Sequence, residues 1–421
     1  MTDTIYALSS GAPPAGIGVI RISGPRAGEA LSRMANGLPP ARSPRLRILR
    51  NGEGAALDQA LVIWFAGPNT ATGEDLAEIH CHGGRAVVAA LLAALSSIDG
   101  LREAEPGEFT RRAFSNGRID LAEAEGLADL LSAETELQRR GALLAAGGDL
   151  SRRIEGWRDR VLGLAASIEA VIDFSDEDDV ALPASFPREL DELIGEIRAT
   201  SQRPATERLR DGIRVVLAGP PNAGKSSLFN ALLSDDAAIV TSEAGTTRDV
   251  LERPVSIGGV PLVLVDTAGM RDSGAGAIEE MGIERARKEV ANGHIVLWLG
   301  APDELPFGAI QISAHSDLGE GQSVGLEVSA VTGFGLSELM DMLVEKARDI
   351  LPPVDQIAFN GRQREWAQTA AQSLVNVDTH SDLLIAAENL RAARRALDRL
   401  VGRDSTEEML DALFGRFCIG K

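Results

Sequence analysis

The sequence has little cysteine, no long apolar run and no excess of positive charge. Only two cysteines, Cys81 and Cys418, occur in 421 residues, so we expect reduced thiols and no disulfide framework. The longest apolar stretch, Ala86–Leu95, has ten residues, which is too short to span a bilayer. The first residues also lack the basic-then-apolar pattern of a signal peptide. These absences lead us to expect a soluble cytoplasmic protein that does not associate with membranes.

The net charge of −20 argues against a protein that coats nucleic acid with its whole surface. Residues 173–179 form an acidic run with five carboxylates. Such a run favours a hydrated loop between helices over a metal site. His80, Cys81 and His82 do not predict a metal site either, because alternate residues of a strand point to opposite faces and three consecutive ligands cannot converge.

The length and the pattern of the chain predict several domains. Residues 1–118 mix short strands with a helix near 85–96, which indicates a compact α/β domain. Residues 119–210 and 349–421 are rich in Ala, Leu and charged residues at helical spacing, and the α/β pattern returns in 211–348. We therefore expect an amino-terminal α/β domain and a helical domain. A nucleotide-binding domain, with a mostly parallel sheet flanked by helices, is expected to be inserted into the helical one.

A phosphate-binding loop is the clearest motif in the chain. Gly-Pro-Pro-Asn-Ala-Gly-Lys-Ser occupies 219–226, after the apolar run Ile213–Ala218 and before a helix-like segment. In such loops backbone N–H groups surround the phosphates, a lysine reaches the β and γ oxygens, and a hydroxyl binds Mg²⁺. The residues expected to bind the nucleotide here are Asn222, Ala223, Gly224, Lys225, Ser226 and Ser227.

Two further segments occur in the order that is typical of GTP-binding domains. A loop at 245–249 contains Thr246 and Thr247, which can reach Mg²⁺ and the γ-phosphate. The apolar segment Val260–Val265 then leads into Asp266, Thr267, Ala268 and Gly269, and a carboxylate at the end of this strand suits the environment of Mg²⁺. The three motifs occur in the expected order, so a nucleotide hydrolase is the favoured interpretation.

The hydrolytic residue of small GTPases is missing, because Met270 follows Gly269 where they have a glutamine. Two replacements are possible from residue type. Glu279 can orient water and Asn222 can help to hold a monovalent cation over the phosphates. The sequence alone favours Glu279 as a surface acid and Asn222 as a turn former over these roles.

The base-recognition motif also departs from the usual pattern. GTP-binding domains read guanine with Asn-Lys-x-Asp, whereas this chain has Ala-His-Ser-Asp at 314–317, so Asp317 alone remains. Ser329 and Ala330 fit the backbone contact to the guanine O6 that follows in such domains. An ATPase stays open as an alternative.

Cys418 lies four residues from the end of the chain, after a helix for which Ser405 and Glu408 are the expected capping pair. Arg416 and Lys421 should favour its thiolate, which would make it a nucleophile or redox thiol on a tether. The alternative is a small apolar residue in a docked tail.

Several short segments together resemble the MnmE (TrmE) family of tRNA-modification GTPases, and the likeness covers essentially the whole chain. They are Asp3-Thr4-Ile5, the stretch 18–24, Thr72-Gly73-Glu74-Asp75, the stretch 106–114 and the terminal Cys418-Ile419-Gly420-Lys421. A terminal Cys-x-Gly-Lys together with this phosphate loop is a specific combination.

The resemblance implies a reaction and its partners. Members of the family form homodimers through the amino-terminal domain, which binds 5-formyltetrahydrofolate or a related one-carbon donor. With MnmG, a partner that carries FAD, they add an aminomethyl-type (carboxymethylaminomethyl) group to C5 of the wobble uridine of certain tRNAs. The implied boundaries are 1–118 for the folate-binding and dimerisation domain, 119–210 and 349–421 for the two parts of the helical domain, and 211–348 for the GTPase domain.

The resemblance also implies residue roles. Folate would be contacted by Arg21, Glu78, Arg118 and Lys421, although the family often has lysine where this chain has Arg118. K⁺ would be held by Asn222, Thr241, Thr246 and a backbone carbonyl near Glu243, and Mg²⁺ by Ser226 and Thr247. Thr241 thereby joins the GTP-binding residues, and the catalytic groups would be Lys225, the water-orienting Glu279 and Cys418. K⁺ would supply the charge of the missing arginine finger.

One rival from another class remains open, a GTP-dependent RNA or ribosome assembly switch without modification chemistry. The altered segment at 314–317 favours it slightly. A folate pocket and a terminal thiol argue against it, because a pure switch needs neither.

Overall fold

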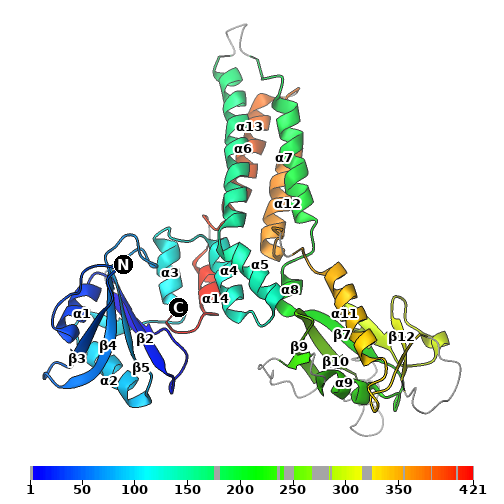
Figure 1. Ribbon diagram of the computed structural model, residues 1–421. Helices are drawn as coiled ribbons and strands as arrows, with labels where there is room; N and C mark the ends of the chain where they lie inside the picture. Colours follow the sequence, from blue (N-terminus) through cyan, green and yellow to red (C-terminus); the bar gives the residue numbers. More distant parts are fainter. Residues whose placement is uncertain are drawn as a thin grey trace. The chain divides into compact units, whose positions relative to one another are not determined.

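The computed structural model describes residues 3–174, 181–234, 238–240, 251–267, 284, 287–314, 325–353, 356–380, 382–403 and 406–420. The chain forms two compact units, one of residues 1–128 with 401–421 and one of residues 129–400 (Figure 1). Among the described residues, no helix has both the length and the apolar character that a bilayer span requires.

The first unit is built on a six-stranded sheet in the order β3-β4-β5-β2-β1-β6, antiparallel except for the pair β1 and β6. Its strands are β1 (Thr4–Leu8), β2 (Ile17–Ser23), β3 (Arg45–Arg50), β4 (Ala56–Phe65), β5 (Leu76–His82) and β6 (Leu101–Glu103). Its helices are α1 (Ala27–Ala35), α2 (Arg85–Ser96), α3 (Glu108–Ser115) and α14 (Glu407–Phe414), and α4 (Leu121–Ser132) begins in it.

Helices α1 and α2 cover one face of this sheet. Ile20 and Ile22 of β2 and Ile79 and Cys81 of β5 point into the core that these helices close. Because side chains alternate along a strand, Arg21, Glu78 and His80 lie on the opposite face. Cys81 and its two histidine neighbours therefore point to opposite sides, as expected.

The second unit contains a seven-stranded sheet in the order β13-β12-β11-β7-β10-β9-β8. The pairs from β13 to β10 are parallel, and β9 and β8 add two antiparallel strands at one edge. The strands are β7 (Ile213–Ala218), β8 (Ala238–Val240), β9 (Leu251–Ile257), β10 (Val260–Asp266), β11 (Ile295–Trp298), β12 (Ile310–Ala314) and β13 (Leu326–Val328). Helices α9 (Lys225–Ser234) and α11 (Leu336–Ile350) pack on this sheet, and η2 (Pro302–Glu304) is a single 3₁₀ turn.

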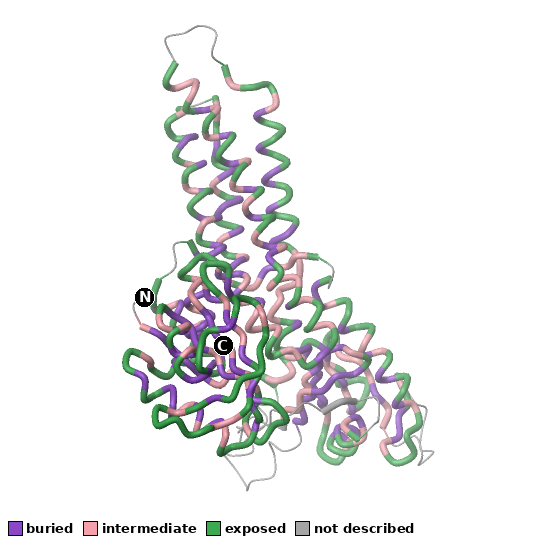
Figure 2. Tube along the Cα trace, turned by 60° about the vertical axis from the view of Figure 1, so that its left-hand side comes forward, coloured by how far each residue is buried: buried purple, intermediate pink, exposed green. Residues whose placement is uncertain are grey.

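Four long helices of the second unit form a bundle around Trp157, whose ring meets Phe359 edge-on at 6.3 Å. They are α6 (Asp149–Asp173), α7 (Phe186–Ser201), α12 (Gly361–Val375) and α13 (Leu383–Leu400). Figure 2 shows their buried positions turned towards one another. Two helices precede the parallel sheet in the chain and two follow it, so the nucleotide-binding segment is inserted within the helical part, as predicted.

Two short helices join the bundle to the parallel sheet, α5 (Glu136–Ala146) and α8 (Glu207–Asp211). Leu137 of α5 and Leu209 of α8 pack in the core of the nucleotide-binding segment. Gln138 completes a capping box with Thr135 at the start of α5, and its Nε2 also donates to the carbonyl of Arg210 at 3.0 Å. The helical part is thereby anchored directly on the sheet.

Candidate functional site

The phosphate loop lies between β7 and α9, as the sequence predicts. Strand β7 is buried at five of its six positions, which is typical of a central parallel strand covered on both faces. Gly219 (φ 149°) and Gly224 (φ 89°) have positive φ, and so does Asn222 (φ 61°). A Cβ on Gly219 would lie 3.1 Å from the carbonyl carbon of Leu299, so the loop needs glycine there.

Lys225 is nearly buried at the start of α9, with 5% of its surface exposed. Its Nζ donates to the carbonyl of Pro220 at 2.7 Å, across the loop. An ammonium group held across a helix N-terminus, where free N–H groups also point outwards, forms an anion site suited to phosphate.

Ser226 and Asp266 form the second part of the site. The Ser226 hydroxyl donates to Asp266 Oδ2 at 2.7 Å, and Asp266 is buried at the end of β10. Thr267 follows, and its Oγ1 donates to the carbonyl of Leu217 at 2.8 Å, which ties β10 to β7. A hydroxyl beside a buried carboxylate provides hard oxygen ligands of the kind that Mg²⁺ prefers, so these residues fit the metal.

The expected base-binding segment lies at the same edge of the sheet, because β13 is parallel to its neighbours and its carboxyl end precedes Ser329. Ser329 is buried, and its Oγ accepts from the N–H of Thr332 at 3.2 Å within a tight turn that includes Ala330. The predicted residues Thr241, Glu243, Thr246, Thr247, Ala268, Gly269, Glu279, Asp317 and Lys421 lie outside the described residues.

The predicted folate residues fall in two places within the first unit. Arg21 and Glu78 are paired across β2 and β5, with Arg21 Nη2 at 2.9 Å from Glu78 Oε1. Burial raises the pKa of Glu78, but hydrogen bonds from His80 and Arg21 outweigh it and hold the pKa below its usual value. Glu78 therefore presents a carboxylate on the face of the sheet that α1 and α2 leave uncovered.

Arg118 lines a hollow of about 460 Å³ to which neither Arg21 nor Glu78 contributes. The hollow is bordered by Phe114, Gly117, Arg118, Ile119, Asp120, Glu123, Val401, Gly402, Arg403 and Leu410.

The carboxyl-terminal tail is docked, yet Cys418 is exposed. Its neighbours anchor the chain, because Phe417 is buried and Ile419 forms a β-bridge with Pro106. Gly420 (φ 95°) lies so close to β1 that a Cβ would clash with the carbonyl oxygen of Leu8. The structure thus combines the two alternatives, since the tail is docked but the thiol faces outwards.

The helix before this tail begins differently from the prediction. Thr406 is the N-cap of α14, and its Oγ1 accepts from the N–H of Met409 at 3.4 Å. Ser405 was predicted for this role, and it lies outside the described residues. The cap therefore falls at Thr406, whose hydroxyl satisfies one of the free N–H groups of the first turn.

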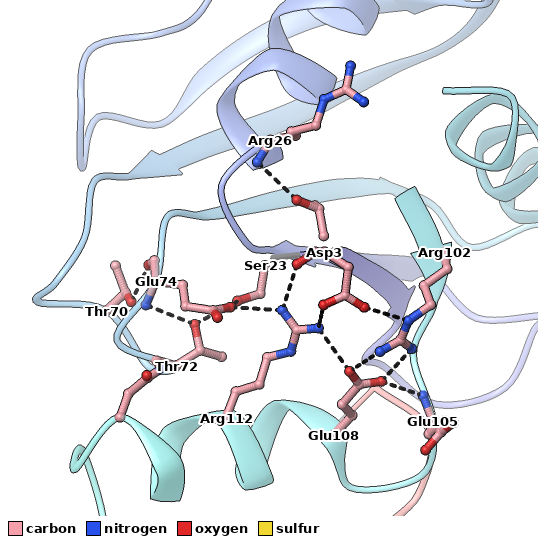
Figure 3. A network of polar contacts seen from close by, with 12 residues as sticks. Asp3, Ser23, Arg26, Thr70, Thr72, Glu74, Arg102, Glu105, Glu108 and Arg112 are labelled. Carbon is pink, nitrogen blue, oxygen red and sulfur yellow. Dashed lines mark hydrogen bonds and ion pairs between the residues drawn. The ribbon is translucent and has the colours of Figure 1, made fainter. Parts of the chain in front are cut away.

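A buried ionic network surrounds Arg112 (Figure 3), and no motif in the sequence predicts it. Arg112 is 0% exposed, and its guanidinium donates to the side chains of Asp3, Glu74 and Glu108 at 3.0, 3.1 and 2.9 Å. The Ser23 hydroxyl donates to Glu74 Oε2 at 2.9 Å. The hydroxyls of Ser23 and Thr72 are hydrogen-bonded to each other at 2.7 Å. These residues come from the separate segments that carried the family resemblance, so those segments meet at one guanidinium.

Together, the phosphate loop, the buried lysine and the Ser226–Asp266 pair define a P-loop nucleotide-binding protein. Two protein-family models match the chain on a larger scale. The model described as "GTP-binding protein TrmE N-terminus" matches residues 4–118, and "MnmE helical domain" matches residues 121–418.

Curated relatives match over the full length. The tRNA modification GTPase MnmE of Erythrobacter litoralis (strain HTCC2594) is 57% identical over 423 residues, with 100% of both chains covered. The protein of the same name from Novosphingobium aromaticivorans is 54% identical over 437 residues, again with 100% of both covered. This chain therefore belongs to the MnmE (TrmE) family. Among solved structures, the G domain of the T. maritima FeoB iron transporter is 25% identical and covers 32% of this chain and 98% of that chain, with a TM-score of 0.24.

The network around Arg112 predicts acid sensitivity. Burial raises the pKa of Glu108, but hydrogen bonds from Arg102, from the Glu105 N–H and from Arg112 outweigh it and lower the pKa from its usual value of 4.5. A carboxylate with a lowered pKa stabilises the fold above the unfolded value, and this contribution is lost as the pH falls through the folded value. The melting temperature should therefore fall steeply below about pH 4.5.

Glu108→Gln tests this. This substitution should lower the free energy of unfolding by on the order of 2–3 kcal/mol at pH 7. It should also flatten the dependence of melting temperature on pH between pH 3 and 7. Glu29→Gln is the control, since it changes an exposed carboxylate that pairs with Arg26 and Arg33 on α1 and should follow the wild type. Parallel curves for wild type and Glu108→Gln would show that Glu108 does not carry the effect.

Proposed function

We propose that this protein hydrolyses GTP to drive modification of the wobble uridine of certain tRNAs. The names of its full-length relatives support tRNA modification and GTP hydrolysis. The observation that carries the proposal is the Ser226–Asp266 pair beside the buried Lys225, because these are the groups that phosphoryl transfer requires. We propose a cytoplasmic location, as for other enzymes that act on tRNA.

A small set of residues would bind the nucleotide and its ions and catalyse hydrolysis. Lys225 would neutralise the β and γ oxygens, while Ser226, oriented by Asp266, and Thr247 would hold Mg²⁺. Bound Mg²⁺ would neutralise the charge that develops on the phosphates. Asn222, whose side chain is exposed on the loop, would hold K⁺ with Thr241, Thr246 and the carbonyl near Glu243. Glu279 would orient the attacking water, and Asp317, Ser329 and Ala330 would read the guanine.

We propose that Arg21 and Glu78 form part of a site for a tetrahydrofolate one-carbon donor, with Arg118 and Lys421. Glu78 has the chemistry for this role, because a carboxylate accepts two N–H groups of an aminopyrimidinone ring, and Arg21 holds it in place. The donor would supply the one-carbon unit, and a flavoprotein partner, MnmG with its FAD, would supply the redox chemistry.

Lys225→Ala is the first test of the proposed function. GTP turnover should fall about 10²-fold or more, because a group that stabilises transition-state charge is lost. In cells that lack the protein, mass analysis of wobble uridines should show the unmodified nucleoside, restored by the intact chain and not by Lys225→Ala. Lys288→Ala is the matched control, since Lys288 is exposed and forms an ion pair with Glu284 at 2.9 Å on the surface. Normal uridines in the deletion strain would refute the proposal.

Cys418→Ser tests the role of the thiol. The hydroxyl keeps the size and the exposed position of Cys418 but is a far weaker nucleophile at neutral pH. We expect modification to be lost while GTP hydrolysis continues at the wild-type rate. Cys81→Ala removes the other thiol, which is buried, and should keep both activities. If Cys418→Ser lost both activities, a structural role would replace the chemical one.

The exposed part of the sheet face opposite α1 and α2 supports the proposed homodimer. Ile17, Leu46, Ile48 and Leu61 lie on it and are 62, 57, 48 and 37% exposed. Leu46 and Leu61 are directly opposite each other in the register of β3 and β4. Exposed apolar side chains on one face of a sheet are the kind of surface that an interface covers, and Arg21 and Glu78 lie on the same face.

Ile48→Glu should therefore weaken the dimer, because it would place a charge in an apolar interface. Sedimentation equilibrium should give a dimer mass for the wild type and a monomer mass for the variant at the same concentration. Leu38→Glu is the control, because Leu38 is 45% exposed but lies just after α1, away from this face. A dimer mass for Ile48→Glu would place the interface elsewhere.

A further inference from the structure

The edge strand of the first unit carries a row of arginines. Strand β3 ends the strand order of its sheet, so one side of its backbone has no neighbouring strand within the described residues (Figure 1). Four exposed arginines follow this strand and the segment that leads into it, namely Arg42, Arg45, Arg47 and Arg50. We call these four residues the arginine row.

The chain holds these side chains without neutralising them. Each guanidinium donates to a backbone carbonyl, that of Asn69 for Arg42, Pro44 for Arg45, Leu46 for Arg47 and Gly54 for Arg50. Within the described part of the chain, no carboxylate forms an ion pair with any of the four. Their positive charges are therefore available to an anion from outside this chain.

The charge of this region is opposite to that of the whole protein. Residues 38–57 contain four arginines and one carboxylate, Glu53, whereas the chain has a net charge of −20. The next carboxylate, Asp58, already accepts from the backbone N–H and the ring of His82, both at 2.8 Å. Charged side chains also protect edge strands from pairing with other strands, but either sign serves that purpose. Cations alone, in an acidic protein, point to an anionic partner.

The length of the row fits an extended anion. A strand rises about 3.3 Å per residue, so Arg45 and Arg50 are about 16 Å apart along β3. Arg45 and Arg47 point to the same side of the strand, because side chains alternate. Leu46 and Ile48 point to the other side, where the proposed dimer contact lies. A single small anion would meet one or two of these arginines, whereas a polyanion can meet the whole row.

We propose that the arginine row binds the sugar–phosphate backbone of the tRNA. This inference rests on the proposed function in one respect, because it takes tRNA as the polyanion. Guanidinium groups suit phosphate, since their N–H donors match its oxygens in pairs. Backbone contacts of this kind position a nucleic acid and do not read its sequence. The row contributes affinity without distinguishing one tRNA from another.

Arg45→Gln with Arg47→Gln tests the row in the full-length protein. Binding to a purified tRNA with a wobble uridine is measured by fluorescence anisotropy over a range of salt concentrations. The variant should bind about tenfold or more weakly at about 50 mM salt. The slope of log affinity against log salt should become shallower by about 1.5, because about 0.7–0.9 counterion is released per phosphate contact. A tRNA without a wobble uridine should lose affinity by the same factor.

Arg152→Gln with Arg188→Gln is the matched control. It changes the net charge by the same amount at exposed arginines of α6 and α7, which pair with Asp149 and Glu192. Affinity for tRNA and its salt slope should stay at wild-type values. Melting temperature, GTP turnover and dimer mass should stay unchanged in both double variants, since all the substituted side chains are on the surface.

Glu53→Gln should act in the opposite direction. Glu53 is exposed in the turn between β3 and β4, and it is the carboxylate nearest in sequence to Arg50. Removing its negative charge should strengthen tRNA binding about twofold or more at low salt, because repulsion of the phosphates is lost. A merely structural role of this turn would not produce a gain.

The outcomes distinguish this inference from the proposed function. Equal tRNA affinity of wild type and Arg45→Gln/Arg47→Gln, or no tRNA binding by the wild type, would overturn the inference. The proposed function is decided separately, by GTP turnover and by the wobble uridines of the deletion strain. A loss of affinity confined to tRNAs with a wobble uridine would indicate base recognition and would contradict a backbone contact. An altered dimer mass or flavoprotein affinity with unchanged tRNA affinity would assign the row to a protein partner and would also overturn the inference.

Discussion

The parallel pairing of β7 and β10 is the constraint on which the nucleotide site depends. Their register sets Asp266 opposite Leu217, the next-to-last residue of β7 before the phosphate loop. Parallel strands end at the same edge of a sheet, so the carboxylate of Asp266 meets Ser226 at 2.7 Å. A slip of one residue would turn Asp266 to the other face of the sheet and separate its carboxylate from Ser226.

The same strand connects the site to the helical part. Leu137 of α5 packs in the core that includes β10, and Glu136 of α5 lies against Gly259 in the turn between β9 and β10. A packed contact transmits a displacement because interiors are dense and have few voids. A change in β10 that accompanies hydrolysis would therefore act on α5 directly.

Local patterns in the sequence predicted much of this structure. The helix expected near 85–96 is α2, and the apolar runs at 213–218 and 260–265 are β7 and β10, because periodicity and glycine turns are local signals. The network around Arg112 was not predictable in the same way. Its carboxylates, Asp3, Glu74 and Glu108, lie far apart in sequence and only the folded sheet brings them together. Segments that looked like separate family signatures proved to be parts of one buried ionic site.

The central claim is that this phosphate loop hydrolyses GTP with a monovalent cation in place of an arginine finger. The most direct measurement is the GTP turnover of the purified protein in KCl and in NaCl at equal ionic strength. The account predicts fast turnover in K⁺ and slow turnover in Na⁺, because the cation site must match the ion that stabilises the transition-state charge. Equal rates in the two salts, or no turnover in K⁺, would contradict it.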